Sequence, residues 1–151
     1  MNERNSARAG TLLAGALAAD GLLHAYWATG GSWPAEDRVT LARLVLNSDR
    51  PSSFRPAIVG PLAGLLILAS ATTLARVRRL GRLGRLIPYP LLQLGVLAVA
   101  AGLLLRGAQG VWIALWGDVN TTFYKLNLVA YTPACLLLSA ATVAVTRSGR
   151  P

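Results

Sequence analysis

Charged residues are scarce in this chain, and acidic residues are the scarcest. Charged residues make up 14% of the 151 positions, whereas a soluble domain carries about 25%. Hydrophobic residues make up 54%, and most of them occur in long runs. Because a surface in contact with water needs charged side chains, this composition excludes an ordinary soluble domain and indicates a protein whose solvent is lipid.

The shortage of acids leaves a net charge of +9, from 15 Lys and Arg against 6 Asp and Glu. In a soluble protein this excess would favour a nucleic-acid partner. Here the arginines lie between the apolar runs, where cations set the orientation of membrane helices. We therefore predict no nucleic-acid partner.

Residues that support redox and metal chemistry are nearly absent. Cys135 is the only cysteine, so an internal disulfide, a CxxC pair and a thiolate zinc site are excluded. His24 is the only histidine and Met1 the only methionine, so a haem iron would lack its second axial ligand. Asp20 and His24 alone make an incomplete metal set. We expect neither a metal nor a cofactor.

Four apolar runs are long enough to cross a bilayer as helices, which takes about 20 residues each. They cover residues 11–28, 56–75, 86–105 and 126–146. This pattern predicts an all-α fold, a four-helix transmembrane bundle that forms one integral membrane domain over residues 1–151. A signal peptide cleaved after residue 18 is the alternative for the first run, although the run continues to Ala28.

The cations between the runs predict how the bundle is oriented. The short segment between the second and third runs contains five arginines, Arg76, Arg78, Arg79, Arg82 and Arg85. Short cation-rich loops stay in the cytoplasm, so we expect this loop and both termini on that side. The preference for arginine over lysine fits a GC-rich bacterial genome, and we expect a multi-pass protein of the bacterial cytoplasmic (inner) membrane.

The two exterior loops contain candidate interfacial helices. Residues 39–46 place their apolar side chains on one helical face and are typical of a short helix lying on the surface. Residues 110–118 place Trp112 and Trp116 four positions apart, which suits a short interfacial helix or a re-entrant cap.

Asp20 and His24 are the most informative polar residues, because they lie four positions apart inside the first run and share one helix face with Trp27. An ionisable group at this depth costs several kcal/mol unless it is paired or hydrated. The pair can be a buried acid that handles protons, or it can form an interhelical hydrogen bond that only fixes packing. Both interpretations stay open.

The third and fourth runs supply further polar groups on the same side of the membrane. Arg106 is expected to end the third span, while Tyr124, Asn127 and Tyr131 share a face of the fourth. Pro133 should kink that helix, which would let Asn127 and Tyr131 point towards Asp20 and His24. Alternatively, Asn and Tyr only anchor the helix at the interface.

Aromatic residues are 7% of the chain and are unevenly distributed. All except Tyr89 fall in or near the exterior half, whereas a membrane-anchoring belt normally occupies both interfaces. They either decorate the exterior loops or line a pocket that opens outward. The candidate substrate-binding residues of such a pocket are Tyr26, Trp27, Trp33, Arg106, Trp112, Trp116, Asn127 and Tyr131.

The segment LLHAYWATGGSWP at residues 22–34 combines His24, Tyr26, Trp27, Ala28, Gly30, Gly31 and Trp33. With this His-x-Tyr-Trp-Ala and Gly-Gly-x-Trp pattern, and with a later Tyr-x-Pro-x-Cys-Leu stretch, the chain resembles a family of small bacterial membrane proteins of unknown function. Pro34 stands where that family usually has glycine, so this turn should differ. The resemblance implies four helices and no particular activity.

Three classes of function fit these residues. The first is an enzyme that cyclises an isoprenoid-type substrate, with Asp20 and His24 as catalytic groups and aromatic rings that stabilise the cation, as membrane-bound terpene cyclases do. The second is a module that binds a lipid or a partner without chemistry. The third is a subunit of a small proton-coupled transporter, which would need a homo-oligomer to make room for a conduit. We expect the lipid bilayer and a hydrophobic small molecule as partners.

Overall fold

The structure is a computed structural model, and it describes residues 3–78 and 88–147. No strand occurs in these residues, so the predicted all-α class is confirmed. The helices are α1 (Glu3–Ala28), α2 (Arg38–Leu46), α3 (Pro56–Arg78), α5 (Tyr89–Trp116), α6 (Thr122–Leu126) and α7 (Thr132–Arg147). A 3-10 turn at Pro51–Phe54 precedes α3, and a π turn at Asn127–Tyr131 joins α6 to α7.

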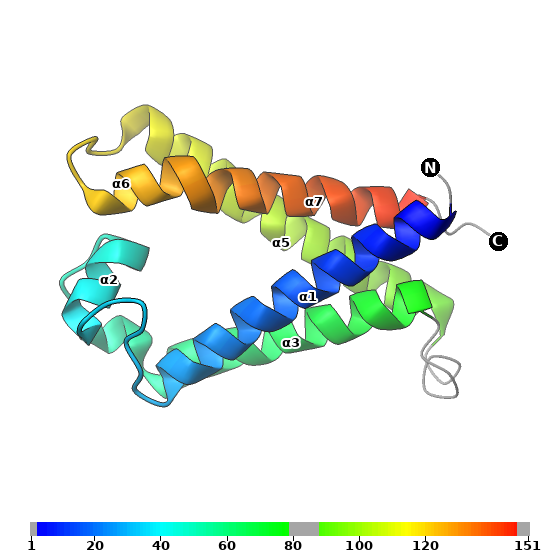
Figure 1. The fold of residues 1–151 in the computed structure, drawn as a ribbon, viewed down its shortest axis with the longest axis horizontal. Coiled ribbons are helices and arrows are strands. Elements are labelled where there is room, and N and C mark those ends of the chain that lie inside the picture. Colours follow the sequence, from blue (N-terminus) through cyan, green and yellow to red (C-terminus); the bar gives the residue numbers. More distant parts are fainter. Residues whose placement is uncertain (1–2, 79–87, 148–151) are drawn as a thin grey trace.

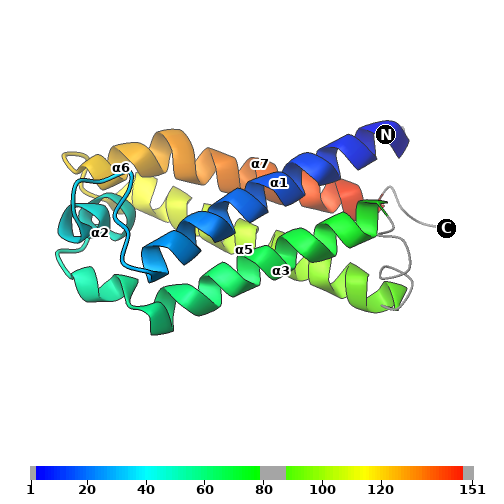
Figure 2. The ribbon, with the colours of Figure 1, turned by 60° about the horizontal axis from the view of Figure 1, so that its bottom comes forward.

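The long helices form two antiparallel pairs, α1 with α3 and α5 with α7 (Figures 1 and 2). One serine hydroxyl joins the helices of each pair: Ser70 donates to the Ala14 carbonyl at 2.7 Å, and Ser139 donates to the Ala100 carbonyl at 3.0 Å. The start of α1 and the end of α7 lie at one end of the molecule, while α2 and α6 lie together at the other (Figure 1). In Figure 1 the two pairs diverge towards the end that carries α2.

Three helical segments of the described chain are long and apolar enough to cross a membrane. They are Pro56–Arg76, Pro90–Trp116 and Thr122–Ala144. The predicted span at 11–28 is not among them, because Asp20 and His24 interrupt its apolar sequence. The three segments indicate a membrane protein, whereas the count of four spans and their orientation stay predictions. Of the five arginines that predict the orientation, Arg79, Arg82 and Arg85 lie outside the described residues.

The third helix is longer than predicted, and it corrects the expectation for the loop that follows. Residues 110–116 do not form a separate interfacial or re-entrant helix, because they are the last two turns of α5. No proline or charged residue separates Arg106 from Trp116, so the backbone hydrogen bonds continue to Gly117, whose N–H bonds the Ile113 carbonyl at 2.7 Å. Arg106 therefore lies inside a helix and does not end it.

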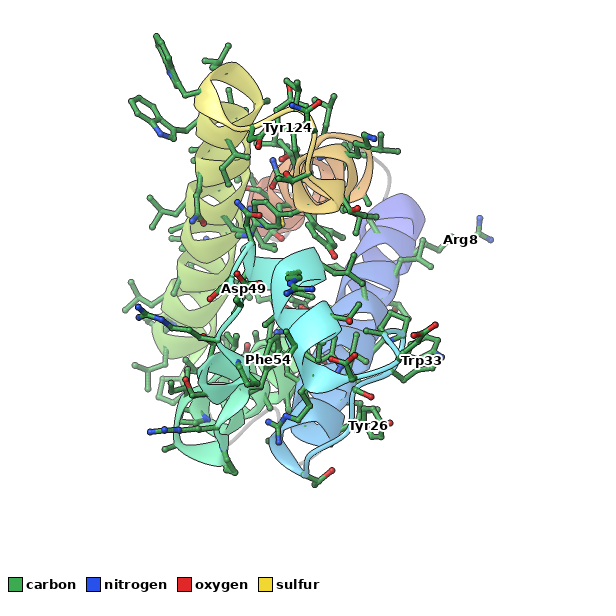
Figure 3. The ribbon with its side chains drawn as sticks, turned by 90° about the vertical axis from the view of Figure 1, so that its left-hand side faces the viewer. Arg8, Tyr26, Trp33, Asp49, Phe54 and Tyr124 are labelled. Atoms are coloured by element: carbon green, nitrogen blue, oxygen red, sulfur yellow. The ribbon has the colours of Figure 1, made fainter. Side chains whose placement is uncertain are left out.

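The predicted surface helix at 39–46 is present as α2, but it is packed against the protein. Leu41 and Ala42 have no exposed surface and contact Trp27, Phe54 and Val59. Figure 3 shows Phe54 beneath α2. The five buried residues Trp27, Leu41, Ala42, Phe54 and Val59 are called the cap cluster below.

The start of α2 is held by its N-cap. The Asp37 carboxylate accepts hydrogen bonds from the backbone N–H groups of Val39 and Thr40, at 2.7 and 2.9 Å. The backbone and side-chain hydrogen bonds from Thr40 hold the pKa of Asp37 below its ordinary value. The ionised carboxylate therefore helps to place α2 over the end of the bundle at neutral pH.

Candidate functional site

Asp20 and His24 contact each other on α1, as their spacing predicts. His24 Nδ1 lies 3.2 Å from Asp20 Oδ1 and 2.9 Å from the Asp20 backbone carbonyl oxygen. The other side of the imidazole packs edge-on against the Trp27 indole, with the ring centroids 4.8 Å apart. His24 is therefore held between the acid of Asp20 and the Trp27 ring of the cap cluster.

The inner face of α1 is covered everywhere except at Asp20. Leu13, Leu17 and Trp27 lie on the same helical stripe as Asp20 and are 1%, 3% and 4% exposed. The Asp20 side chain between them is 51% exposed, while that of His24 is 16% exposed. The packing between α1 and its neighbours is thus interrupted at the level of the carboxylate, and Asp20 remains accessible on a face that is otherwise buried.

A second polar group lies between α5 and the fourth apolar run. Arg106 Nη1 donates to Asn127 Oδ1 at 3.3 Å, and the guanidinium carbon lies 5.8 Å from the centre of the Tyr131 ring. Asn127 is fully buried, and its amide nitrogen donates to the Gly110 carbonyl at 2.9 Å. The arrangement depends on the π turn, in which the Thr132 N–H bonds the carbonyl of Asn127, five residues earlier. Such turns occur frequently at functional sites.

Cys135 lies on α7, where it is half-buried. Helix α7 packs against both α5, which carries Arg106, and α1, which carries Asp20. The region between α1 and the α5–α7 pair is called the shared region below. A molecule in this region would meet the apolar surfaces of three helices, with polar groups on α1 and α5.

Residues 17–142 match the family described as Protein of unknown function (DUF3995). The chain belongs to the DUF3995 family. All the candidate site residues fall within the matched segment. No curated protein and no solved structure matches the chain. The expected membership of a family of unknown function is confirmed, whereas its His-x-Tyr-Trp-Ala signature and its bacterial origin stay predictions.

Several aromatic residues of the DUF3995 chain that sequence reasoning assigned to a pocket lie on the outside. Trp112 and Trp116 face each other across 5.9 Å between their ring centroids, but they are 64% and 72% exposed. Trp33 is 66% exposed, and both it and Tyr26 lie at the periphery in Figure 3. Of the predicted aromatic residues, Trp27 packs beside His24 and Tyr131 packs beside Arg106. Only part of the predicted aromatic set therefore lies beside the polar groups.

One feature of the DUF3995 site was missed at the sequence level. Gly107 and Gly110 face α7, where they lie close to Leu136 and Thr132 respectively. The Gly-x-x-Gly spacing that begins directly after Arg106 is the signal that could have indicated this close approach of the two helices.

Proposed function

We propose that this protein spans the membrane four times and binds a hydrophobic small molecule between α1 and the α5–α7 pair. In this arrangement α1 crosses the membrane in addition to the three long apolar segments. Its 26 residues extend about 39 Å, and it runs alongside α3 (Figure 1). Both termini and the arginine-rich segment then lie on the cytoplasmic side of the bacterial inner membrane. The cap cluster and α6 lie on the exterior side.

The exposure of Asp20 on the inner face of α1 supports this proposal most directly. An ionisable residue inside a membrane bundle normally pairs with a neighbouring helix, because an ionised carboxylate without a partner or water is costly in a hydrocarbon environment. Asp20 contacts His24 of its own helix and leaves half of its side-chain surface uncovered. A ligand with a polar group and an apolar body fits such a surface better than lipid chains alone do.

Filling the shared region should displace the ligand. We expect Cys135→Phe to reduce by more than half the amount of lipid-like molecule that co-purifies with the protein, because the added ring would enlarge a half-buried residue of α7, which packs against α1 and α5. The quantity is measured by solvent extraction and mass spectrometry of protein purified in a mild detergent. Ala140→Phe is the matched control, since Ala140 is an exposed residue of the same helix. Equal retention by the two variants would show that only annular lipid is present.

Catalysis at the same site is the second candidate, and the accessible Asp20–His24 pair is the observation that favours it. A carboxylic acid beside an imidazole can protonate an apolar substrate, which is the first step of acid-triggered isoprenoid cyclisation. Trp33, Trp112 and Trp116 do not surround Asp20, so Trp27 and Tyr131 would have to stabilise the cation.

The test of catalysis is product formation from a farnesyl- or geranylgeranyl-derived substrate. Asp20→Asn should abolish the product while lipid retention persists, and Glu36→Gln, in an exposed loop, should not change it. Turnover that is unaffected by Asp20→Asn would rule out this chemistry and leave the binding role.

A further inference from the structure

Within residues 3–78 and 88–147, the hydrogen bond and the ring contact of the Arg106 side chain are both with uncharged groups. Its guanidinium uses one N–H group on Asn127 and lies beside the Tyr131 ring. The Asn127 amide is held in place by its bond to Gly110, so its oxygen stays directed at Arg106. A guanidinium has five N–H donors, so most of the hydrogen-bonding capacity of Arg106 is not used by these contacts.

Three aspartates of the described chain are engaged elsewhere. Asp20 contacts His24, Asp49 contacts Arg43, and Asp37 caps α2. Among the described residues, no carboxylate lies within ion-pair distance of Arg106. A half-buried positive charge in a membrane bundle is unfavourable without an anionic partner. The charge of Arg106 therefore favours the binding of an anion that is not part of the chain.

We propose that Arg106 binds the head group of a long-chain carboxylate, a molecule of the fatty-acid type. This inference rests on the proposed function and specifies its ligand. A carboxylate matches the planar fork of a guanidinium, which can donate two parallel hydrogen bonds to its two oxygens. One guanidinium balances one negative charge, which favours a head group that carries a single charge.

The position of Arg106 selects a small head group. Arg106 lies 17 residues after the start of α5, about 26 Å along the helix, and ten residues before its end. The helix thus continues about 15 Å beyond it towards Trp112 and Trp116. A ligand bound by Arg106 must bring its head inside the bundle, which is easier for a single carboxylate than for the glycerol phosphate of a bilayer lipid.

The test compares two probes that differ only in head-group charge. Purified full-length protein in a nonionic detergent is incubated with radiolabelled oleate, which is then displaced by unlabelled oleate or by methyl oleate. Oleate should bind at least about tenfold more tightly than its methyl ester, as expected for a charge-assisted hydrogen-bonded pair. Arg106→Gln should remove this preference and leave methyl oleate binding unchanged. Arg43→Gln, which removes an exposed arginine of α2, should keep it.

The remaining outcomes separate this inference from the function it rests on. Binding of neither probe to the wild-type protein would contradict the proposed function itself. Equal binding of oleate and methyl oleate to the wild-type protein would keep the binding site and overturn the role of Arg106. If Arg106→Gln does not fold, Arg106→Lys should show a reduced preference, because it keeps the charge and loses the fork. Phosphatidylglycerol that displaces oleate more effectively than oleate itself would show that the head group is a lipid phosphodiester and not a carboxylate.

Discussion

Gly110→Ala should destabilise the protein by about 1–3 kcal/mol, the range for overpacking a tightly packed position. A Cβ at residue 110 would overlap the Thr132 hydroxyl and lie 2.9 Å from the Thr132 Cβ, which is too close for α5 and α7 to keep their separation. The same movement would disturb the hydrogen bond from Asn127 to the Gly110 carbonyl. We therefore expect the midpoint of thermal unfolding, followed by circular dichroism in detergent, to fall.

Gly102→Ala is the matched control on the same helix. No atom lies within 4 Å of a Cβ built at residue 102, so the added methyl group meets open space. Alanine is the better helix former by about 1 kcal/mol, so this variant should be as stable as the wild type or more stable. A similar loss of stability in both variants would mean that the effect comes from α5 alone and not from its contact with α7.

Trp27→Ala should cost about 3–5 kcal/mol, as expected for truncating a buried aromatic side chain. Trp27 is 4% exposed and packs its ring against Phe54 and His24, with centroid distances of 5.5 and 4.8 Å. Its indole N–H also donates to the Trp33 carbonyl at 2.7 Å. The expected result is a lower unfolding midpoint together with faster proteolysis of the chain on either side of α2.

Trp33→Ala removes the same type of residue from an exposed position and should have little effect, since Trp33 takes part in the bond to Trp27 only through its backbone. Trp27→Phe should lie between the two, because it keeps a ring in the cap cluster and loses a hydrogen bond worth about 1 kcal/mol. Equal stability of Trp27→Ala and Trp33→Ala would contradict the assignment of Trp27 to the core.

The contact between His24 and Trp27 also connects the cap cluster to the polar site. The two rings meet edge to face, and Asp20 lies one turn further into the bundle. Because Trp27 supports one side of the imidazole, its removal should loosen the Asp20–His24 contact as well. Lipid retention by Trp27→Ala at a temperature where the variant is still folded is therefore informative about the site and about the cap.

Local patterns in the sequence predicted local structure well. The Asp20–His24 contact follows from a spacing of four residues on one helix, and it needs no knowledge of other elements. The helix at Arg38–Leu46 was predicted from its own periodicity, although its packing was not. The end of the third helix was predicted at the wrong place, because an arginine after a long apolar run looks like the edge of a membrane. Arg106 is instead accommodated on an inner face by Asn127 and Tyr131.

Contacts between elements were harder to predict. Asn127 and Tyr131 were expected to point towards Asp20, but the residues they contact are Gly110 and Arg106 of α5. The π turn changes the helical register between them, and its position depends on the packing of α7 against α5 as much as on Pro133. The direction of Trp112 and Trp116 likewise depends on the rotation of α5 about its axis, which aromatic content does not reveal.

The sequence by itself determined that this protein is helical, that it contains apolar segments of membrane length and that Asp20 and His24 contact each other. These properties follow from composition and from spacings along one helix, which are independent of the rest of the fold. Only the tertiary structure decided that Asp20 is uncovered on a buried face, that Arg106 has neutral neighbours, and that α7 packs against both α1 and α5. Each of these depends on the rotation and separation of neighbouring helices, which small residues such as Gly110 set through close packing.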